Sequence, residues 1–576
     1  MSLLAALVRA YDRDEKAPPY GFSSEKIGFC VVLNADGSVA EVADLRDTDK
    51  KRSPRMLLVP QAVKRTAGIA PNFLWDKSAY VLGVTAGEGK RTAEEHARFR
   101  DKHLEGLAEA RDDGLVALRR FLERWEPASF GPPLWDEEAR DQNLVFRLAG
   151  EFTFLHDRPA ARTLWRQIGA GGASDPQICL VTGEAGPVAR LHPSIKGVWG
   201  AQSSGASLIS FNLDAFTSYG HDQGDNAPLS EAAAFAYTTA LNGFLSDKEH
   251  RLQIGDASTV FWADAAEEEA EEAENLFAAY YDTASDDRLA AGKVGSKLEA
   301  IRNGAQLTEI APNLAQGVRF HVLGLAPNAA RLSVRFYWTS DFGTLTENYQ
   351  RYLRDTELAP PPRDGWPPLW RYLVELASQG KRENVPPLIA GEWMRAILTG
   401  APYPLTLLST TLMRVRADGE VNALRAAILK SVLIRNFKSK ETPVALDPAN
   451  TNKGYMLGRL FAVYEEVQRG ALGGNVNATI KDKFYGAASA TPQKVFRTLD
   501  AGSQNHFSKL RKQSPGRAVN LEKLLTSITD LMDPGNDPIP ASLNAAEQAL
   551  FGIGYYHQRS DFFRKHDDKT SEEPVK

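Results

Sequence analysis

A proline-rich break divides this chain into two parts of different character. The break is APPPRDGWPP at residues 359–368. Proline fixes φ and lacks a backbone donor, so neither a helix nor a central strand can run through it. Before the break, β-branched runs alternate with helix-like segments, and after it such runs nearly vanish. We therefore predict an α+β fold, with a mixed α/β N-terminal module containing hairpins over residues 1–358 and an all-α helical bundle over residues 366–576.

Local patterns predict individual elements in both parts. Before the break they indicate two hairpins at 27–45 and 319–338, and two helices at 92–125 and 230–245. They also indicate three further strands, at 143–149, 178–182 and 206–212. The second hairpin is expected to turn at Pro327-Asn328, and Ser230 is expected to cap its helix. After the break the helix-like segments are 368–379, 389–399, 421–437, 455–470, 492–511, 519–532 and 541–565.

Composition excludes several classes of protein. A length of 576 residues allows two to four domains, and 43% hydrophobic with 24% charged residues excludes general disorder. The chain has no apolar run long enough to cross a membrane. MSLLAALVRAYDRDEK has the pattern of an amphipathic helix and not of a signal peptide, which favours a cytoplasmic location. A net charge of -5 means that any nucleic-acid contact must come from local basic patches.

Motifs for catalysis are incomplete. Cys30 and Cys179 are too few for a disulfide framework or a zinc ribbon. GEGKR at 87–91 lacks the first glycine and the Ser/Thr of a phosphate-binding loop, and GAQSSGAS at 200–207 lacks the spacing of a nucleophile elbow. We expect no catalytic residue, metal or cofactor. A metal-dependent nuclease or phosphohydrolase using a His-Asp pair, at 156–157, 221–222 or 566–567, remains the alternative.

Three polar, glycine-bearing segments are typical of recognition loops. In Pro60–Asp76, Lys64 and Arg65 suit phosphate contacts, and Asn72 can bond base edges. For Phe73, Leu74 and Trp75 we favour anchoring in the core over stacking on bases. Ile195–Asn212 offers Gln202, Ser203 and Ser204, either for a ligand or for a tight turn. For Ser218–Ser230 a structural loop is favoured over an anion site.

Two charge runs stand apart. Asp264–Glu274 holds seven carboxylates in eleven residues and is interpreted as a solvated helix or loop. Residues 481–523 carry nine Lys or Arg against three Asp or Glu. This second run either forms a solvated face or binds a phosphate backbone.

Four long motifs together resemble a known family. They are PxxxKRTxGIxPNFLWDxxxYVLG at 60–83, CLVTGE at 179–184, HPxIKGVxGAQSSGASLxSFN at 192–212 and AFxSYGxxQGxNAPxSExAAFAYTTALN at 215–242. They are similar to the large subunit of the type I-C CRISPR surveillance complex, Cascade (the Cas-eight-c or Csd-one family). The resemblance continues through 321–338 into the helical part and covers nearly the whole chain.

The resemblance implies a non-catalytic role in a guide-RNA complex. Such subunits recognise the protospacer-adjacent motif (PAM) on duplex DNA, help to open the strands into an R-loop, contact the non-target strand and recruit the Cas-three helicase-nuclease. The implied partners are Cas-five-type and Cas-seven-type subunits that carry the crRNA, target double-stranded DNA, and a small subunit from the same gene. A pure assembly scaffold is a further alternative.

The candidate contacts fall in two groups. Those for DNA and the PAM are Lys64, Arg65, Asn72, Trp75, Lys77, Gln202, Ser203 and Ser204. Those for the non-target strand are Lys481, Lys483, Lys494, Arg497, Lys509, Arg511, Lys512 and Arg517. Among the internal methionines, Met456 follows Lys453-Gly454, whose codons can spell a purine-rich ribosome-binding sequence. It is therefore our candidate start for a separate small subunit, residues 456–576.

Overall fold

The computed structural model describes residues 2–48, 52–63, 65, 68–170, 176–281, 293–363, 365–473 and 478–564. The chain forms two compact units. The first comprises Met1–Ile195 and Ser207–Gly243, and the second comprises Lys196–Ala206 and Phe244–Lys576. Helix accounts for 51% and strand for 14%, with strands in the N-terminal part and helices in the C-terminal part, so the predicted α+β class is confirmed.

The first unit is built on a four-stranded sheet in the order β3-β2-β6-β5. The strands are β2 (Phe29–Leu33), β3 (Val39–Asp44), β5 (Asp76–Lys77) and β6 (Asn143–Leu148). All five residues of β2 are buried, because Phe29, Val31 and Leu33 pack in one core and Cys30 and Val32 in another. The sheet is therefore covered on both faces, as successive residues of a strand point to opposite sides.

The two faces have different covers. Helices α2 (Ser78–Val81), α3 (Thr92–Gly106) and α4 (Asp113–Arg124) pack on one core. The ribbon of β1 (Phe22–Ile27) and β4 (Arg55–Pro60) contributes to the other. The unit also contains α1 (Leu3–Arg13), α5 (Pro159–Ala170), β7 (Gln177–Ile178), β8 (Ala185–Gly186) and α6 (Glu231–Ser246).

The second unit starts with an antiparallel sheet in the order β12-β11-β10-β9. Its strands are β9 (Arg251–Ile254), β10 (Ala257–Asp264), β11 (Arg319–Asn328) and β12 (Arg331–Asp341). The helices nearest to it in sequence are α7 (Glu267–Tyr281), α9 (Lys293–Arg302), α10 (Leu307–Ile310), α11 (Pro312–Ala315) and α12 (Phe342–Thr356). In α7, Glu267, Glu268 and Glu271 are exposed while Leu276 and Phe277 are buried, so the acidic run belongs to a solvated helix, as interpreted.

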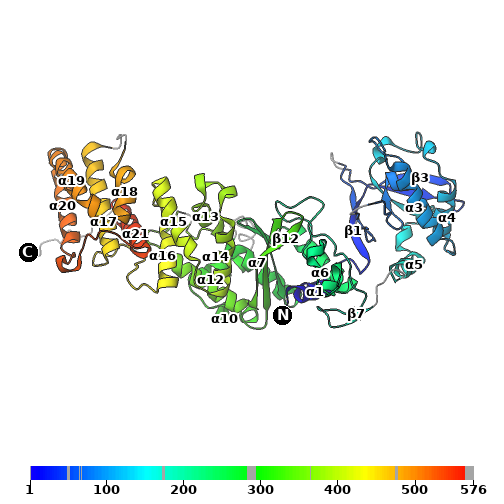
Figure 1. The fold of residues 1–576 in the computed structure, drawn as a ribbon, viewed down its shortest axis with the longest axis horizontal. Coiled ribbons are helices and arrows are strands. Elements are labelled where there is room, and N and C mark those ends of the chain that lie inside the picture. The colour runs from blue at the N-terminus through cyan, green and yellow to red at the C-terminus, as the bar shows by residue number, and fades with distance from the viewer. Residues whose placement is uncertain are drawn as a thin grey trace, which may run out of the picture. The chain divides into compact units, whose positions relative to one another are not determined.

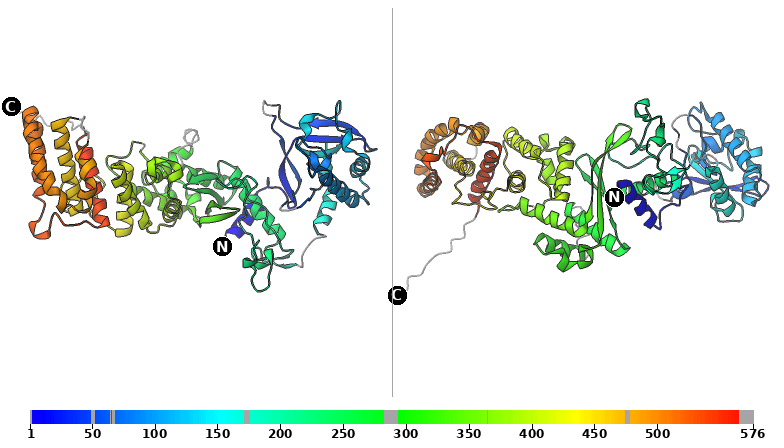
Figure 2. Two further views of the ribbon diagram at one scale, coloured as in Figure 1. Left: turned by 45° about the horizontal axis from the view of Figure 1, so that its top comes forward. Right: turned by 60° about the horizontal axis from the view of Figure 1, so that its bottom comes forward.

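Helices fill the described part of the chain after the proline-rich break. They are α13 (Leu369–Val374), α14 (Pro387–Thr399), α15 (Leu405–Asp418), α16 (Ala423–Phe437), α17 (Lys453–Leu472), α18 (Ile480–Ala490), α19 (Gln493–Gln513), α20 (Pro515–Thr529) and α21 (Ala545–Asp561). The last five lie side by side and are drawn in orange to red in Figures 1 and 2. Gly454 and Gly458 let α17 touch α21, because a Cβ at either position would collide with the carbonyl oxygens of Glu547 and Phe551.

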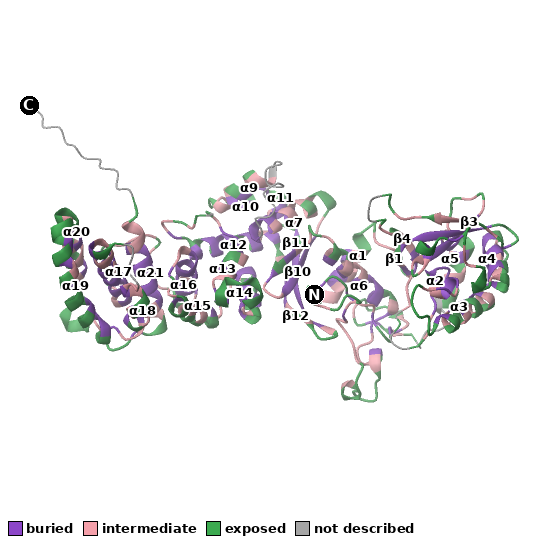
Figure 3. Cartoon of the chain, turned by 90° about the horizontal axis from the view of Figure 1, so that it is seen from above, coloured by how far each residue is buried: buried purple, intermediate pink, exposed green. Residues whose placement is uncertain are grey.

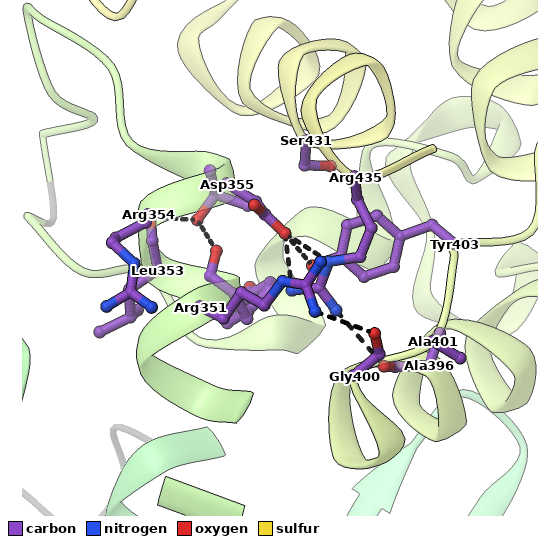
Figure 4. Close-up of polar contacts among 12 residues, drawn as sticks. Arg351, Leu353, Arg354, Asp355, Ala396, Gly400, Ala401, Tyr403, Ser431 and Arg435 are labelled. Carbon is purple, nitrogen blue, oxygen red and sulfur yellow. Dashed lines mark hydrogen bonds and ion pairs between the residues drawn. The ribbon is translucent and has the colours of Figure 1, made fainter. Parts of the chain in front are cut away.

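A buried ion pair joins helices α12 and α16. Asp355 Oδ2 accepts from Arg435 Nε at 2.6 Å and from the Tyr403 hydroxyl at 3.0 Å (Figure 4). The Arg435 guanidinium also lies over the Tyr403 ring, 4.3 Å from its centroid. All three side chains are buried, so each charge needs the other to offset the loss of water.

Most predicted elements are confirmed, with four corrections. Of the strand predicted at 178–182 only the start is observed, as the two-residue strand Gln177–Ile178 paired with Ala185–Gly186. Residues 206–212 form no strand, because bridge pairing is limited to Ala206 and Ser207 and does not continue along the segment. The helix predicted over 92–125 is two helices, α3 and α4, because Asp112 ends the connection by capping α4. The second hairpin turns at Ala329-Ala330, as Asn328 pairs with Arg331. Ser230 accepts from Ala233 N at 3.2 Å, which confirms the cap of α6.

Candidate nucleic-acid interface

The loop at 60–76, in the first unit, is organised around the buried carboxylate of Asp76. Its Oδ2 accepts from Arg65 Nη2 at 2.5 Å and from Asn72 N at 2.8 Å, and its Oδ1 accepts from Lys77 N at 2.8 Å. Burial raises the pKa of Asp76, and the Arg65 charge opposes that shift. Arg65 also donates through Nε to Ala70 O at 2.8 Å. Two of its three side-chain nitrogens, Nε and Nη2, are therefore bonded inside the loop.

Asn72 and Trp75 are turned inward. Asn72 is 4% exposed, and its Oδ1 accepts from Val63 N at 2.9 Å. The Trp75 indole is 3% exposed and donates to Pro60 O at 2.7 Å. Phe73 and Leu74 are buried as well, so the interpretation of 73–75 as core anchors is confirmed. Lys77 is exposed, whereas Lys64 lies outside the described residues.

A buried histidine that the sequence did not point to holds the same loop. His103 Nε2 accepts from Leu74 N at 2.9 Å, so the ring proton is on Nδ1, which faces Phe99 O at 2.8 Å. Burial lowers the pKa of His103 to about 3, and the ring is neutral at physiological pH. Leu74 adopts φ 62°, which a branched side chain rarely does. Its bond to His103 helps to fix that conformation.

The loop at 196–206, in the second unit, presents its polar side chains to solvent. Gln202, Ser203 and Ser204 are exposed at the tip of a turn closed by Gly205 N and Gln202 O at 2.9 Å. Gly205 has φ +94°, a conformation that favours glycine. The sequence left open whether these residues form a tight turn or contact a ligand. The structure shows a turn whose side chains are all accessible.

Two hydrogen bonds from outside the loop fix its backbone. Trp199 N donates to the buried Ser258 Oγ at 2.9 Å, and Arg251 Nη1 donates to Gly197 O at 3.1 Å. Trp199 is nevertheless 59% exposed, and in the sequence it stands shortly before Gln202. Trp199 was not among the predicted contacts. The sequence feature that could have indicated it is a large aromatic residue between Gly197 and Gly200 in a polar segment.

The third predicted loop, 218–230, is a structural one. Asn226 Oδ1 accepts from Ser218 N at 3.1 Å, and its Nδ2 donates to His221 O and Gln223 O at 2.9 and 3.0 Å. The Asn226 side chain therefore links three backbone positions of the segment by hydrogen bonds. The favoured reading of this loop is confirmed.

Four cations line the exposed face of α19. Val495, Phe496, Leu499, Phe507 and Leu510 are buried toward the bundle. At 100° per residue, Lys494, Arg497, Lys509 and Lys512 fall within an arc of about 120° on the opposite side. All four are exposed, and Figure 3 shows exposed residues along this helix. Lys494 and Lys512 are roughly 27 Å apart along the axis.

The other predicted cations of the bundle differ in their surroundings. Arg511 is ion-paired with Glu522, and Arg517 with Glu466. Lys483 is exposed on α18 and Lys481 is half-buried there. Within the described ranges, none of the four cations on the α19 face is paired with a carboxylate.

Met456, the candidate internal start, lies in the first turns of α17 and is buried. A product starting there would keep Gly458 and helices α18 to α21. It would lack Gly454 and the N-cap Asn452, whose side chain accepts from Tyr455 N at 3.3 Å. Whether Met456 is used as a start stays a prediction.

The His-Asp pairs lie in different environments. His156 is 1% exposed, and burial lowers its pKa to about 4. His221 is exposed in the structural loop, and the pair at 566–567 lies outside the described residues. A search of the described residues finds no group of three or more His, Cys, Asp or Glu that could hold a metal ion. Nor is any helix in the described ranges long and apolar enough to span a membrane. Cys30 and Cys179 are free and buried.

Exposed polar loops and a basic helix face are typical of proteins that contact nucleic acid. The family described as CRISPR-associated protein (Cas_Csd1) matches residues 6–563, and the chain belongs to this family. It is thus of the type I-C Cascade large-subunit family, and the resemblance seen in the sequence motifs is confirmed. No curated protein matches the chain.

Proposed function

We propose that this large subunit recognises the PAM through the exposed tip of the 196–206 loop. The observation that carries the proposal is the accessibility of Gln202, Ser203 and Ser204 on a loop fixed by Ser258 and Arg251. An amide and two hydroxyls can donate and accept at base edges, and a fixed loop loses little entropy on binding. The PAM is short, because guide pairing reads the rest of the target.

The 60–76 loop contributes in a different way in this proposal. Lys77 and the partly exposed Arg65 contact phosphates, whereas Asn72 and Trp75 act chiefly by shaping the loop. Direct contact of Asn72 and Trp75 with DNA stays a prediction, and it would require the loop to open. Strand opening near the PAM precedes pairing with the guide.

The basic face of α19 completes the proposal. Exposed cations spaced along a helix attract a phosphate backbone without reading its sequence. We assign this face to the displaced non-target strand, in the full-length chain and in a small subunit starting at Met456. The same proposal includes docking on a Cas-five-type and Cas-seven-type backbone, recruitment of the Cas-three helicase-nuclease and a non-catalytic role. Membership of the family supports these three points.

The test uses the guide-loaded complex on duplexes with and without a matching PAM. Gln202→Ala should assemble normally but lose about tenfold of the PAM-dependent affinity, as expected for losing a paired base contact. Asn72→Ala is the companion variant, expected to reduce loop stability more than PAM discrimination. Full PAM discrimination in Gln202→Ala would contradict the assignment. Metal-dependent DNA cleavage lost in His221→Ala would favour the nuclease alternative instead.

A further inference from the structure

Two arginine side chains lie over the indole ring of Trp370, a residue of α13. The guanidinium carbon of Arg382 lies 4.0 Å from the centroid of the indole, and that of Arg371 lies at 5.6 Å. Trp370 is half-buried, while Leu369 and Leu373 of the same helix are buried in the core. The indole is therefore a fixed platform. A ring holds a guanidinium flat without using its N–H donors.

Arg382 differs from the other stacked arginines whose contacts the structure describes. Six of them lie over an aromatic ring and also pair with a carboxylate: Arg46 with Asp44, Arg65 with Asp76, Arg140 with Glu137, Arg162 with Asp157, Arg435 with Asp355 and Arg469 with Glu466. Arg382 pairs with no carboxylate of the described chain. Among the described residues, no carboxylate occupies its N–H donors, which leaves them accessible to a ligand.

The loop that bears Arg382 is exposed and unusually shaped. Residues 378–384 are all exposed, and Lys381 precedes Arg382 in the chain. Gln379 has φ 60° and Gly380 has φ 62°, so two successive residues are left-handed. Asn384 Nδ2 donates to Ser378 O at 3.0 Å and closes the loop. A left-handed conformation at a residue other than glycine is disfavoured and often marks a functional segment.

We propose that Arg382, held on Trp370 and flanked by Lys381, binds a phosphate of a nucleic-acid strand. A planar guanidinium matches two phosphate oxygens, and a neighbouring ammonium adds charge for the same backbone. The exposed part of the indole offers a surface on which a base can stack. This site is separate in sequence from the loops and the α19 face, and it does not depend on PAM reading. DNA and RNA share the phosphodiester, so the experiment tests both.

The experiment measures binding of the full chain to labelled single-stranded DNA and RNA of one sequence. Arg382→Ala should weaken binding about tenfold on at least one strand type, as expected for lost hydrogen bonds to a charged group. The slope of log affinity against log salt should fall by about 0.7. Arg395→Ala is the matched control: Arg395 is exposed on α14, pairs with no carboxylate in the described ranges, and its loss changes the net charge equally. It should stay within about twofold.

Two further variants separate stacking from charge. Arg382→Lys keeps the charge but not the planar stack, and Trp370→Leu keeps the arginine but removes its platform; both should lose affinity, by about threefold. Thermal unfolding of each variant shows whether the fold is intact. Equal affinities of Arg382→Ala and Arg395→Ala for DNA and for RNA would overturn the proposal. So would an Arg382→Ala defect confined to an acidic peptide.

Discussion

The loops at 60–76 and 196–206 are both polar, glycine-bearing and connected to a sheet, yet they use their side chains in opposite ways. In the first, the buried carboxylate of Asp76 accepts hydrogen bonds from the Arg65 side chain and from the Asn72 backbone N–H. In the second, backbone contacts to Ser258 and Arg251 fix the loop, and Gln202 to Ser204 are left in solvent. Polar composition alone therefore does not indicate a contact surface. What matters is whether the backbone or the side chains hold the loop.

The largest difference is expected in stability. Asp76→Ala removes the acceptor of Arg65 and leaves the buried N–H of Asn72 unpaired, so we expect the free energy of unfolding to fall by about 3 kcal/mol. Chemical denaturation of the full chain measures it. Gln202→Ala is the control from the exposed loop and should change it by less than about 0.5 kcal/mol. If both variants lowered the free energy of unfolding by similar amounts, side-chain contacts would stabilise the two loops equally, against this comparison.

The stability of the region that holds the 196–206 loop should depend on pH through His250. His250 adjoins Arg251, which holds that loop, and faces Asp247 Oδ2 at 2.9 Å and Glu274 Oε2 at 3.0 Å. Burial opposes its protonation, but these two carboxylates raise the pKa of His250 to about 9. Since the folded pKa exceeds the unfolded value of about 6.5, its stabilisation is complete below pH 6.5 and is lost as the pH rises through 9.

We expect this loss to reach roughly 3 kcal/mol between pH 6 and pH 9.5. Denaturant titrations across that range measure it, and His250→Asn should flatten the profile. His221→Ala, which removes an exposed histidine, should leave the profile unchanged. If the free energy of unfolding of His250→Asn still fell over this pH range, the pH dependence would come from other groups.

The smallest effect is expected on the face of α19. Replacing Lys494 and Lys512 with glutamine should weaken single-stranded DNA binding about fivefold and lower the salt slope by about 1.4, for two lost phosphate contacts. The control pair is Arg511→Gln with Arg517→Gln, which removes the same charge from cations already paired with Glu522 and Glu466. That pair should cost stability more than affinity. The reverse order would assign DNA binding to Arg511 of α19 and Arg517 of α20 instead of to the α19 face.

Sequence patterns were sufficient for what depends on neighbours in the chain. All strands of the described chain precede the proline-rich break, although the break lies inside the second compact unit. Ser230 caps its helix because capping is local. The basic face of α19 was foreseeable as a charge run, and the long motifs were enough to place the chain in its family.

Only the tertiary structure decided which polar residues face solvent. Asn72 and Gln202 are chemically similar, yet one accepts a hydrogen bond from Val63 in the core and the other lies at an exposed turn. Arg65 and Arg382 both stack on aromatic rings, and only the first finds a carboxylate among the described residues. Val63 and Asn72 are 9 residues apart and Arg65 and Asp76 are 11 apart, so the fold of the loop decides whether they meet. A hydrogen-bond donor is used or available according to what the fold brings within about 3 Å of it, and local sequence does not specify that.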